Sequence, residues 1–96
     1  MTRRNYLIAY DISDDKRRTR VFDTLKDYGD HVQFSVFLCA LSPIEIVTLR
    51  GLLSGLIDAR ADQVIILNLG DVQSPLENIL DCLGQRYNSR SKVQVV

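Results

Sequence analysis

The hydrophobic residues of this chain recur with two different periods, which predict strands alternating with helices. Residues 5–12 read as a strand whose two faces are both apolar until Asp11 interrupts one of them. Residues 63–69 form a second strand of the same kind. A strand that is apolar on both sides is normally covered on both sides, so we expect both faces of the sheet to be buried.

Two segments carry apolar residues at helical spacing and have matching start signals. The first is expected to begin after Ser13 or Asp14, both good N-caps, and to run to about residue 28, with Gly29 as its C-cap. The second begins with Ser-Pro-Ile-Glu at 42–45, which has the form of a capping box with proline at the first helical position. We expect this second helix to run to about residue 58 and to bury Ile46, Leu49, Leu53 and Leu56.

Three other segments are less determined by their pattern. Residues 31–41 are long for one strand, and no Gly, Pro or Asn marks a turn inside them, so one bent strand and two short strands both fit. Residues 76–83 fit either a short helix or a short strand. Residues 93–96 are expected to form a last edge strand.

The order of these elements predicts one domain whose helices cover only one face of its sheet. A chain of 96 residues has room for one core. Two helices cover only one face of an antiparallel sheet, and the other face should then be polar, which the strand pattern contradicts. The simplest cover is a second copy of the chain, packed sheet to sheet. The pattern therefore predicts an α+β domain that forms a homodimer.

Composition and charge narrow the class of protein. Hydrophobic residues make up 46% of the chain and charged residues 25%, which is ordinary for a globular protein, and no stretch reaches the roughly 20 apolar residues of a membrane span. Cys39 and Cys82 lack a metal-type or redox-type spacing, and the start MTRRN is a poor signal peptide, so we expect a cytoplasmic protein with two free thiols. The formal net charge is zero, but six of the twelve basic residues lie in the first twenty positions, which suits a local anion site.

The junction between the first strand and the first helix carries the clearest chemical pattern. Asp11 ends an apolar strand, and the first turns of the next helix are basic although the helix macrodipole favours acids there. Asp11 fits three roles: a structural acid, a Mg²⁺ ligand and a general base. One carboxylate holds a catalytic metal poorly, but two copies related by a two-fold axis can share one ion.

The cations and aromatic residues near this junction also have two interpretations each. Arginines match phosphate oxygens bidentately, but nearby acids offer them a purely structural alternative. Tyr10 and Phe37 suit stacking on a nucleobase, but they also suit the core. The residues alone therefore favour a dimeric α+β domain with an Asp and Arg site that fits phosphodiesters. The arginines are Arg17, Arg18 and Arg20, and the acids are Asp14, Asp15, Asp23 and Asp27.

Two stretches, YLIAYDISDDKRRTRVFDTLKDYG and VQFSVFLCALSP, resemble CRISPR-associated protein 2, a small metal-dependent nuclease of the CRISPR adaptation complex. The match is close over residues 5–43 and follows the order of the elements beyond them. The resemblance implies a ferredoxin-like βαββαβ fold with a break between strands near Ser35, and two copies that pack through their sheets. It also implies that Asp11 binds Mg²⁺.

The same resemblance implies which residues act. The family usually has a basic residue where this chain has His31, which lowers the expectation of strong nuclease activity at neutral pH. The positions tied to activity or to nucleic-acid contact are Tyr10, Arg18, Arg20, Ser35 and Phe37.

The resemblance further implies partners. Family members bind the adaptation integrase, CRISPR-associated protein 1, and hold a DNA duplex for insertion into the CRISPR array. Residues 85–96 follow the core at about 1–84, and their strand at 92–96 is expected to pair with the partner subunit. The substrate, RNA or DNA, stays open. The alternatives are a related mRNA-cleaving toxin ribonuclease and a non-catalytic ferredoxin-like interaction module.

Overall fold

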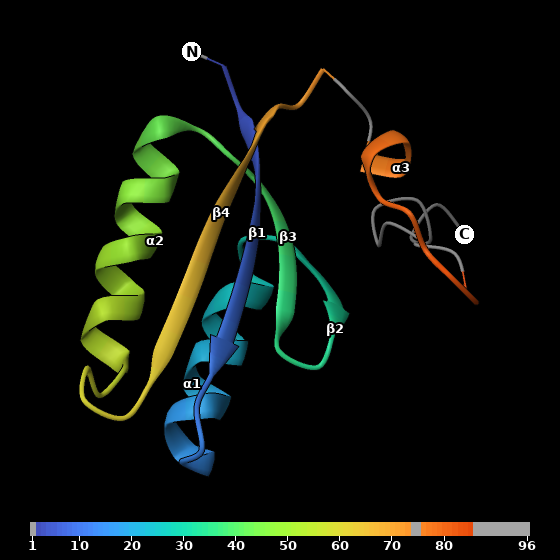
Figure 1. The fold of residues 1–96 in the computed structure, drawn as a ribbon. Coiled ribbons are helices and arrows are strands. Elements are labelled where there is room, and N and C mark those ends of the chain that lie inside the picture. Colours follow the sequence, from blue (N-terminus) through green and yellow to red (C-terminus); the bar gives the residue numbers. More distant parts are fainter. Residues whose placement is uncertain (1, 74–75, 86–96) are drawn as a thin grey trace.

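The computed structural model describes residues 2–73 and 76–85, which fold into an antiparallel sheet with two long helices on one face (Figure 1). The sheet order is β2-β3-β1-β4, which puts β1 in the interior and β4 at an edge. This arrangement confirms the expected α+β, ferredoxin-like βαββαβ fold. The elements are β1 Arg4–Asp11, α1 Asp15–Lys26, β2 Asp30–Gln33, β3 Val36–Leu41, α2 Pro43–Leu56, β4 Gln63–Asp71 and α3 Leu76–Ile79.

The core lies between the sheet and the two long helices, α1 and α2. Alternate residues of β1 point toward the helices and are almost fully buried, because side chains along a strand alternate between its two faces. They pack against Val21 and Leu25 of α1 and Leu49 and Leu53 of α2. The buried residues of β1 and the following loop are Tyr6, Ile8, Tyr10 and Ile12.

The opposite face of the sheet is apolar but largely uncovered by helices, as the strand pattern predicts. In the antiparallel register, Leu7 of β1 lies beside Leu67 of β4, and Ala9 lies beside Ile65. Ile65 and Leu67 are each 51% exposed. We call this side the open face.

The segment 80–85 lies over another part of the open face. Leu80 and Leu83 line a hollow together with Leu7, Val36 and Leu38, and Leu38 is only 4% exposed. Among the described residues, therefore, the β3 side of the open face is partly sheltered within one chain, while the β4 side is not.

The end of α1 differs from its predicted form. Asp14 caps the start as expected, and its carboxylate accepts the backbone N–H of Arg17 at 2.9 Å. The C-cap, however, is Asp27 and not Gly29, whose φ is not positive. Gly29 is needed for a different reason: a Cβ there would collide with the Leu38 carbonyl oxygen and the Cys39 sulfur.

The start of α2 confirms the predicted capping box. Ser42 Oγ accepts the Glu45 N–H at 3.2 Å, and Glu45 Oε1 accepts the Ser42 N–H at 2.9 Å. These bonds satisfy helix N–H groups that have no partner within the helix. The hydrogen bond from the Ser42 backbone N–H lowers the pKa of the Glu45 carboxyl most, and the hydrogen bond from Arg3 lowers it further. The helix ends at Leu56, slightly before the predicted end.

The structure decides the secondary structure of two of the three segments that the sequence pattern left undetermined. Residues 31–41 contain two strands, because Phe34 and Ser35 form a turn between β2 and β3. Residues 76–83 contain one helical turn, α3, and no strand. The predicted edge strand at 93–96 lies outside the described residues. None of the helices in the described part of the chain is long and apolar enough to cross a membrane.

Candidate functional site

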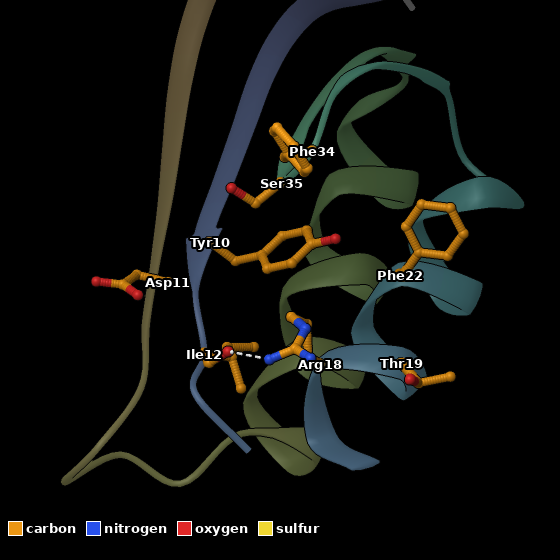
Figure 2. A pocket seen from close by; sticks show the side chains of 8 residues that line it. All are labelled: Tyr10, Asp11, Ile12, Arg18, Thr19, Phe22, Phe34 and Ser35. Atoms are coloured by element: carbon orange, nitrogen blue, oxygen red, sulfur yellow. Dashed lines mark hydrogen bonds between the residues drawn. The ribbon is translucent and has the colours of Figure 1, made fainter. Parts of the chain in front are cut away.

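A hollow of about 360 Å³ lies where β1 ends, between α1 and the turn that joins β2 to β3 (Figure 2). Its walls come from three separate parts of the chain, and they combine aromatic rings with one guanidinium. It brings together several of the predicted site residues. The lining residues are Tyr10, Asp11, Ile12, Arg18, Thr19, Phe22, Phe34 and Ser35.

Tyr10 and Asp11 are neighbours in sequence but point to opposite sides of β1. Figure 2 shows the Tyr10 ring directed toward α1 and the Asp11 carboxylate directed away from the hollow. Tyr10 is 6% exposed, whereas Asp11 is exposed. The alternation of the strand therefore places the carboxylate on the open face, with Leu7 and Ala9.

Arg18 is fixed at the mouth of the hollow by the backbone that follows β1. Its Nη1 donates to the carbonyl oxygens of Ile12 at 3.0 Å and Ser13 at 3.3 Å, and its Nη2 pairs with Asp15. The side chain is still 44% exposed, so part of the guanidinium faces solvent. Burial raises the pKa of Tyr10, and the positive charge of Arg18 offsets only part of that effect. The Tyr10 hydroxyl therefore keeps its proton at neutral pH and can act as a hydrogen-bond donor.

Arg17 does not join Arg18 in this site. Its Nε and Nη2 bind the two carboxylate oxygens of Asp62 at 2.8 and 3.2 Å, and the Asp62 side chain has no solvent exposure. This hydrogen bonding lowers the pKa of Asp62 and raises the pKa of Arg17. The pair ties α1 to the loop before β4, so Arg17 has a structural role in the described molecule.

Arg20 and Lys16 lie one turn apart on the exposed side of α1. Together with Asp15 and Thr19 they line a second, shallower hollow, which shares Thr19 with the first. Among the described residues, neither Arg20 nor Lys16 has an ion-pair partner. These two cations are therefore available to a phosphate.

Phe37 and Ser35 support the site from the sheet. Phe37 is fully buried, and its ring lies 6.4 Å from the Tyr10 ring in a stacked arrangement. Phe37 therefore positions Tyr10 and does not itself reach a ligand in this conformation. The carbonyl oxygen of Ser35 accepts the Tyr10 N–H at 3.1 Å, which ties the turn to β1.

His31 and Phe34 shape the turn itself. His31 Nε2 lies 2.7 Å from the Phe34 carbonyl oxygen, and the ring centroids of Phe22 and Phe37 are each 4.9 Å from the His31 ring. This packing gives His31 a structural role within the chain. Phe34 is 96% exposed, and the sequence pattern missed it because alternation placed it on a continuous strand face.

The donor set for a metal is incomplete in one chain. The described ranges contain no group of three or more His, Cys, Asp or Glu side chains that could hold an ion. Asp11 offers a single exposed carboxylate, and its neighbour across the sheet is Gln63 of β4. Mg²⁺ accepts one or two carboxylates with water filling its other positions, so the residues fit this ion if a second Asp11 is supplied.

Comparison with known proteins identifies relatives for most of the chain. Residues 4–74 match the family model described as CRISPR associated protein Cas2. The chain is 35% identical over 91 residues to a protein of Rhodospirillum rubrum named CRISPR-associated endoribonuclease Cas2 1, covering 95% of this chain and 88% of the relative. It is 42% identical over 66 residues to CRISPR-associated endonuclease Cas2 2 of Thermus thermophilus, covering 69% of this chain and 73% of that protein.

Solved structures agree with these relatives. The crystal structure of Streptococcus pyogenes Cas2 at pH 6.5 superposes with a TM-score of 0.74 at 30% identity, covering 83% of this chain and 99% of that one. A hypothetical protein from Thermus thermophilus gives a TM-score of 0.77 at 33% identity, covering 92% of this chain and 99% of that one.

Proposed function

The chain belongs to the CRISPR-associated protein Cas2 family, and from this premise we propose that it acts as a homodimeric, Mg²⁺-dependent endonuclease and as a DNA-binding scaffold for spacer acquisition. The observation that carries the proposal is the position of Asp11, an exposed carboxylate on a mostly apolar sheet face whose β4 side is not covered by the described residues. Names of relatives that include endoribonuclease or endonuclease support a phosphodiester substrate.

The apolar open face supports the proposed homodimer. Ile65 and Leu67 expose apolar surface next to Leu7 and Ala9 in the antiparallel register. Removing such surface from water contributes about 25 cal/mol for each Å² buried. Packing two copies sheet to sheet covers this surface and brings the Asp11 carboxylates toward a common axis.

The proposed dimer also completes a metal site. Two Asp11 carboxylates held close together without a cation would repel each other. Mg²⁺ bound there would supply a Lewis acid that lowers the pKa of a coordinated water. Asp11 thus has the role of metal ligand in this proposal.

The residues on the helix side bind and orient the nucleic acid. Arg20 presents a cation without an ion-pair partner among the described residues, and Arg18 presents part of a fixed guanidinium. Tyr10 donates a hydrogen bond from the hollow, while Ser35 and Phe37 hold its backbone and ring in place. Arg17 contributes indirectly, by fixing α1 to the loop at Asp62.

The scaffold role assigns duplex DNA and the integrase CRISPR-associated protein 1 as partners in the cytoplasm. Its support is family membership together with the cations along α1. The segment 85–96, proposed to pair with the partner subunit, lies almost entirely outside the described residues.

The test is the Asp11→Asn variant, which preserves the shape of the side chain and removes its charge. We expect cleavage of RNA or duplex DNA in Mg²⁺ to fall at least roughly 100-fold, because the metal loses its ligands. Dimerisation and DNA binding should persist, since they depend on apolar contacts and on arginines. Asp23→Asn, the same change at an exposed position of α1, is the matched control.

Two measurements made side by side separate the two halves of the proposal. Undiminished cleavage by Asp11→Asn would show that Asp11 is a structural acid. Lost cleavage with retained spacer acquisition would show that the scaffold role does not depend on the nuclease. A wild-type protein that binds neither DNA nor RNA would favour a non-catalytic interaction module.

A further inference from the structure

Phe34 is the most exposed aromatic side chain in the described part of the chain, and hydrogen bonds anchor the turn that carries it. Its side chain is 96% exposed at the turn between β2 and β3. His31 lies within hydrogen-bonding distance of the Phe34 carbonyl oxygen, and the neighbouring Ser35 carbonyl accepts the Tyr10 N–H. The backbone of this turn is therefore anchored to β1 and to His31, while the ring that it carries is open to a ligand.

The position of this ring links it to the hollow described above. Figure 2 shows the rings of Tyr10, Phe22 and Phe34, from β1, α1 and the turn, around one space with Arg18 below them. The hollow measures about 360 Å³. Its aromatic walls suit a flat, polarizable group of the size of a nucleobase.

The second hollow on α1 supplies the complementary chemistry. It shares Thr19 with the first hollow and carries Lys16 and Arg20, neither of which has an ion-pair partner among the described residues. An aromatic compartment next to a cationic one matches the arrangement of base and phosphate in a nucleotide.

We propose that Phe34 stacks on an unpaired nucleobase that enters the aromatic hollow, while Lys16 and Arg20 hold a phosphate of the same strand. The inference rests on the nucleic-acid binding proposed above and specifies its substrate class: a strand with an unpaired segment, such as an overhang beside a duplex. Bases inside a duplex are stacked on both sides and cannot offer a face to Phe34.

The site would lie on the helix side of the sheet, and Asp11 borders it without pointing its carboxylate into it. The Asp11 carboxylate points to the opposite side of β1 (Figure 2). Recognition of the unpaired base by this site therefore does not require the open face, and a change at Phe34 should leave the dimer intact.

The experiment compares a blunt DNA duplex with the same duplex extended by a short single-stranded overhang that carries 2-aminopurine. Binding is measured for the wild-type protein, Phe34→Ala, Phe34→Trp and the control Ile44→Ala, whose side chain is 71% exposed on α2. Phe34→Ala should weaken binding of the overhang substrate roughly 5- to 150-fold and leave the blunt duplex unchanged. Phe34→Trp should retain the preference and quench 2-aminopurine fluorescence, and Ile44→Ala should behave as the wild type.

Each outcome decides the question. Equal losses on both substrates, or no loss on either, would overturn the stacking role of Phe34 while leaving nucleic-acid binding in place. A wild-type protein that binds neither substrate would overturn the proposed function together with this inference. Circular dichroism of Phe34→Ala checks that the exposed position has not altered the fold.

Discussion

The two faces of the sheet differ in how far one chain can complete them. On the helix side, Ile8 and Phe37 are fully buried under α1 and α2. On the open face, Ile65 and Leu67 keep half of their surface in solvent. The same strands supply both faces, because side chains alternate along each of them. Stability of the monomer and assembly of the proposed dimer would therefore be encoded in alternate residues.

The chemistry follows the same division. Tyr10 and Arg18 belong to the helix side, where one chain builds the whole hollow. Asp11 belongs to the open face, and the proposed metal site needs this carboxylate from both chains. Under the proposals above, nucleic-acid binding needs one chain and cleavage needs two. This contrast can be tested by disrupting each face in turn.

Leu67→Asp should have the largest effect, because it disrupts contacts of the open face and leaves the helix side intact. A charge placed in an apolar sheet-to-sheet contact is buried without a partner, which costs about 3 kcal/mol or more and raises the dimer dissociation constant at least roughly 100-fold. The monomer should keep its fold, because Leu67 is not part of the helix-side core. Sedimentation equilibrium measures the association, and Mg²⁺-dependent cleavage should fall with it.

Ile44→Asp is the control for this change. Ile44 is 71% exposed on α2, on the helix side of the sheet. Its substitution should leave the dimer intact. A Leu67→Asp protein that stays dimeric, or an unmodified protein that is monomeric at micromolar concentration, would show that the open face is not the interface.

Substitutions of arginines on the helix side should have smaller effects than Leu67→Asp, and they distinguish a binding role from a structural one. Arg20→Ala should reduce the slope of log affinity against log salt by about 0.9, because one phosphate contact is lost, without a change in sequence preference. Arg17→Ala should instead lower the stability of the fold, because it leaves Asp62 without its bidentate partner. An unchanged salt slope for Arg20→Ala would show that Arg20 contacts solvent and not a phosphate.

Asp62 should give the smallest effect, visible in the pH dependence of stability. The hydrogen bond from Arg17 lowers the pKa of Asp62 in the folded chain. Its ionised form therefore stabilises the fold above the unfolded pKa of about 3.9, and this contribution disappears as the pH falls through the lower folded value.

Asp62→Asn removes that contribution. Its urea midpoint at pH 7 should lie below that of the wild-type protein, and the difference should shrink as the pH falls below about 4. Asp23→Asn, at an exposed position of α1, provides the comparison. A difference that is independent of pH would show that the ion pair is not its cause.

The sequence predicted features whose causes are local. The capping box at 42–45 placed the start of α2 at the correct residue, because both of its hydrogen bonds join residues three positions apart. The alternation in residues 5–12 correctly placed Tyr10 and Asp11 on opposite faces of β1. It also predicted that a second apolar face would exist.

Features with distant causes were missed or left open. The turn at Phe34 and Ser35 has no local turn signal and is held in part by a bond to Tyr10, so the pattern alone could not decide between one strand and two, although the family resemblance implied a break there. Arg17 pairs with Asp62, 45 positions away, so its structural role was not visible next to Arg18 and Arg20. Gly29 was assigned to a helix cap, but it is required by the close approach of β3.

The alternation along β1 also limits how a gene for this protein can change in length. A substitution at Leu7 or Ala9 alters one side chain on one face. Deletion of a single codon between Tyr6 and Tyr10 would shift the register and exchange the faces of all the residues beyond it, placing the carboxylate in the hollow and the phenol on the open face. Insertions and deletions in related genes should therefore be rarer in this strand than in the connection after β4, even where individual residues of the strand are substituted.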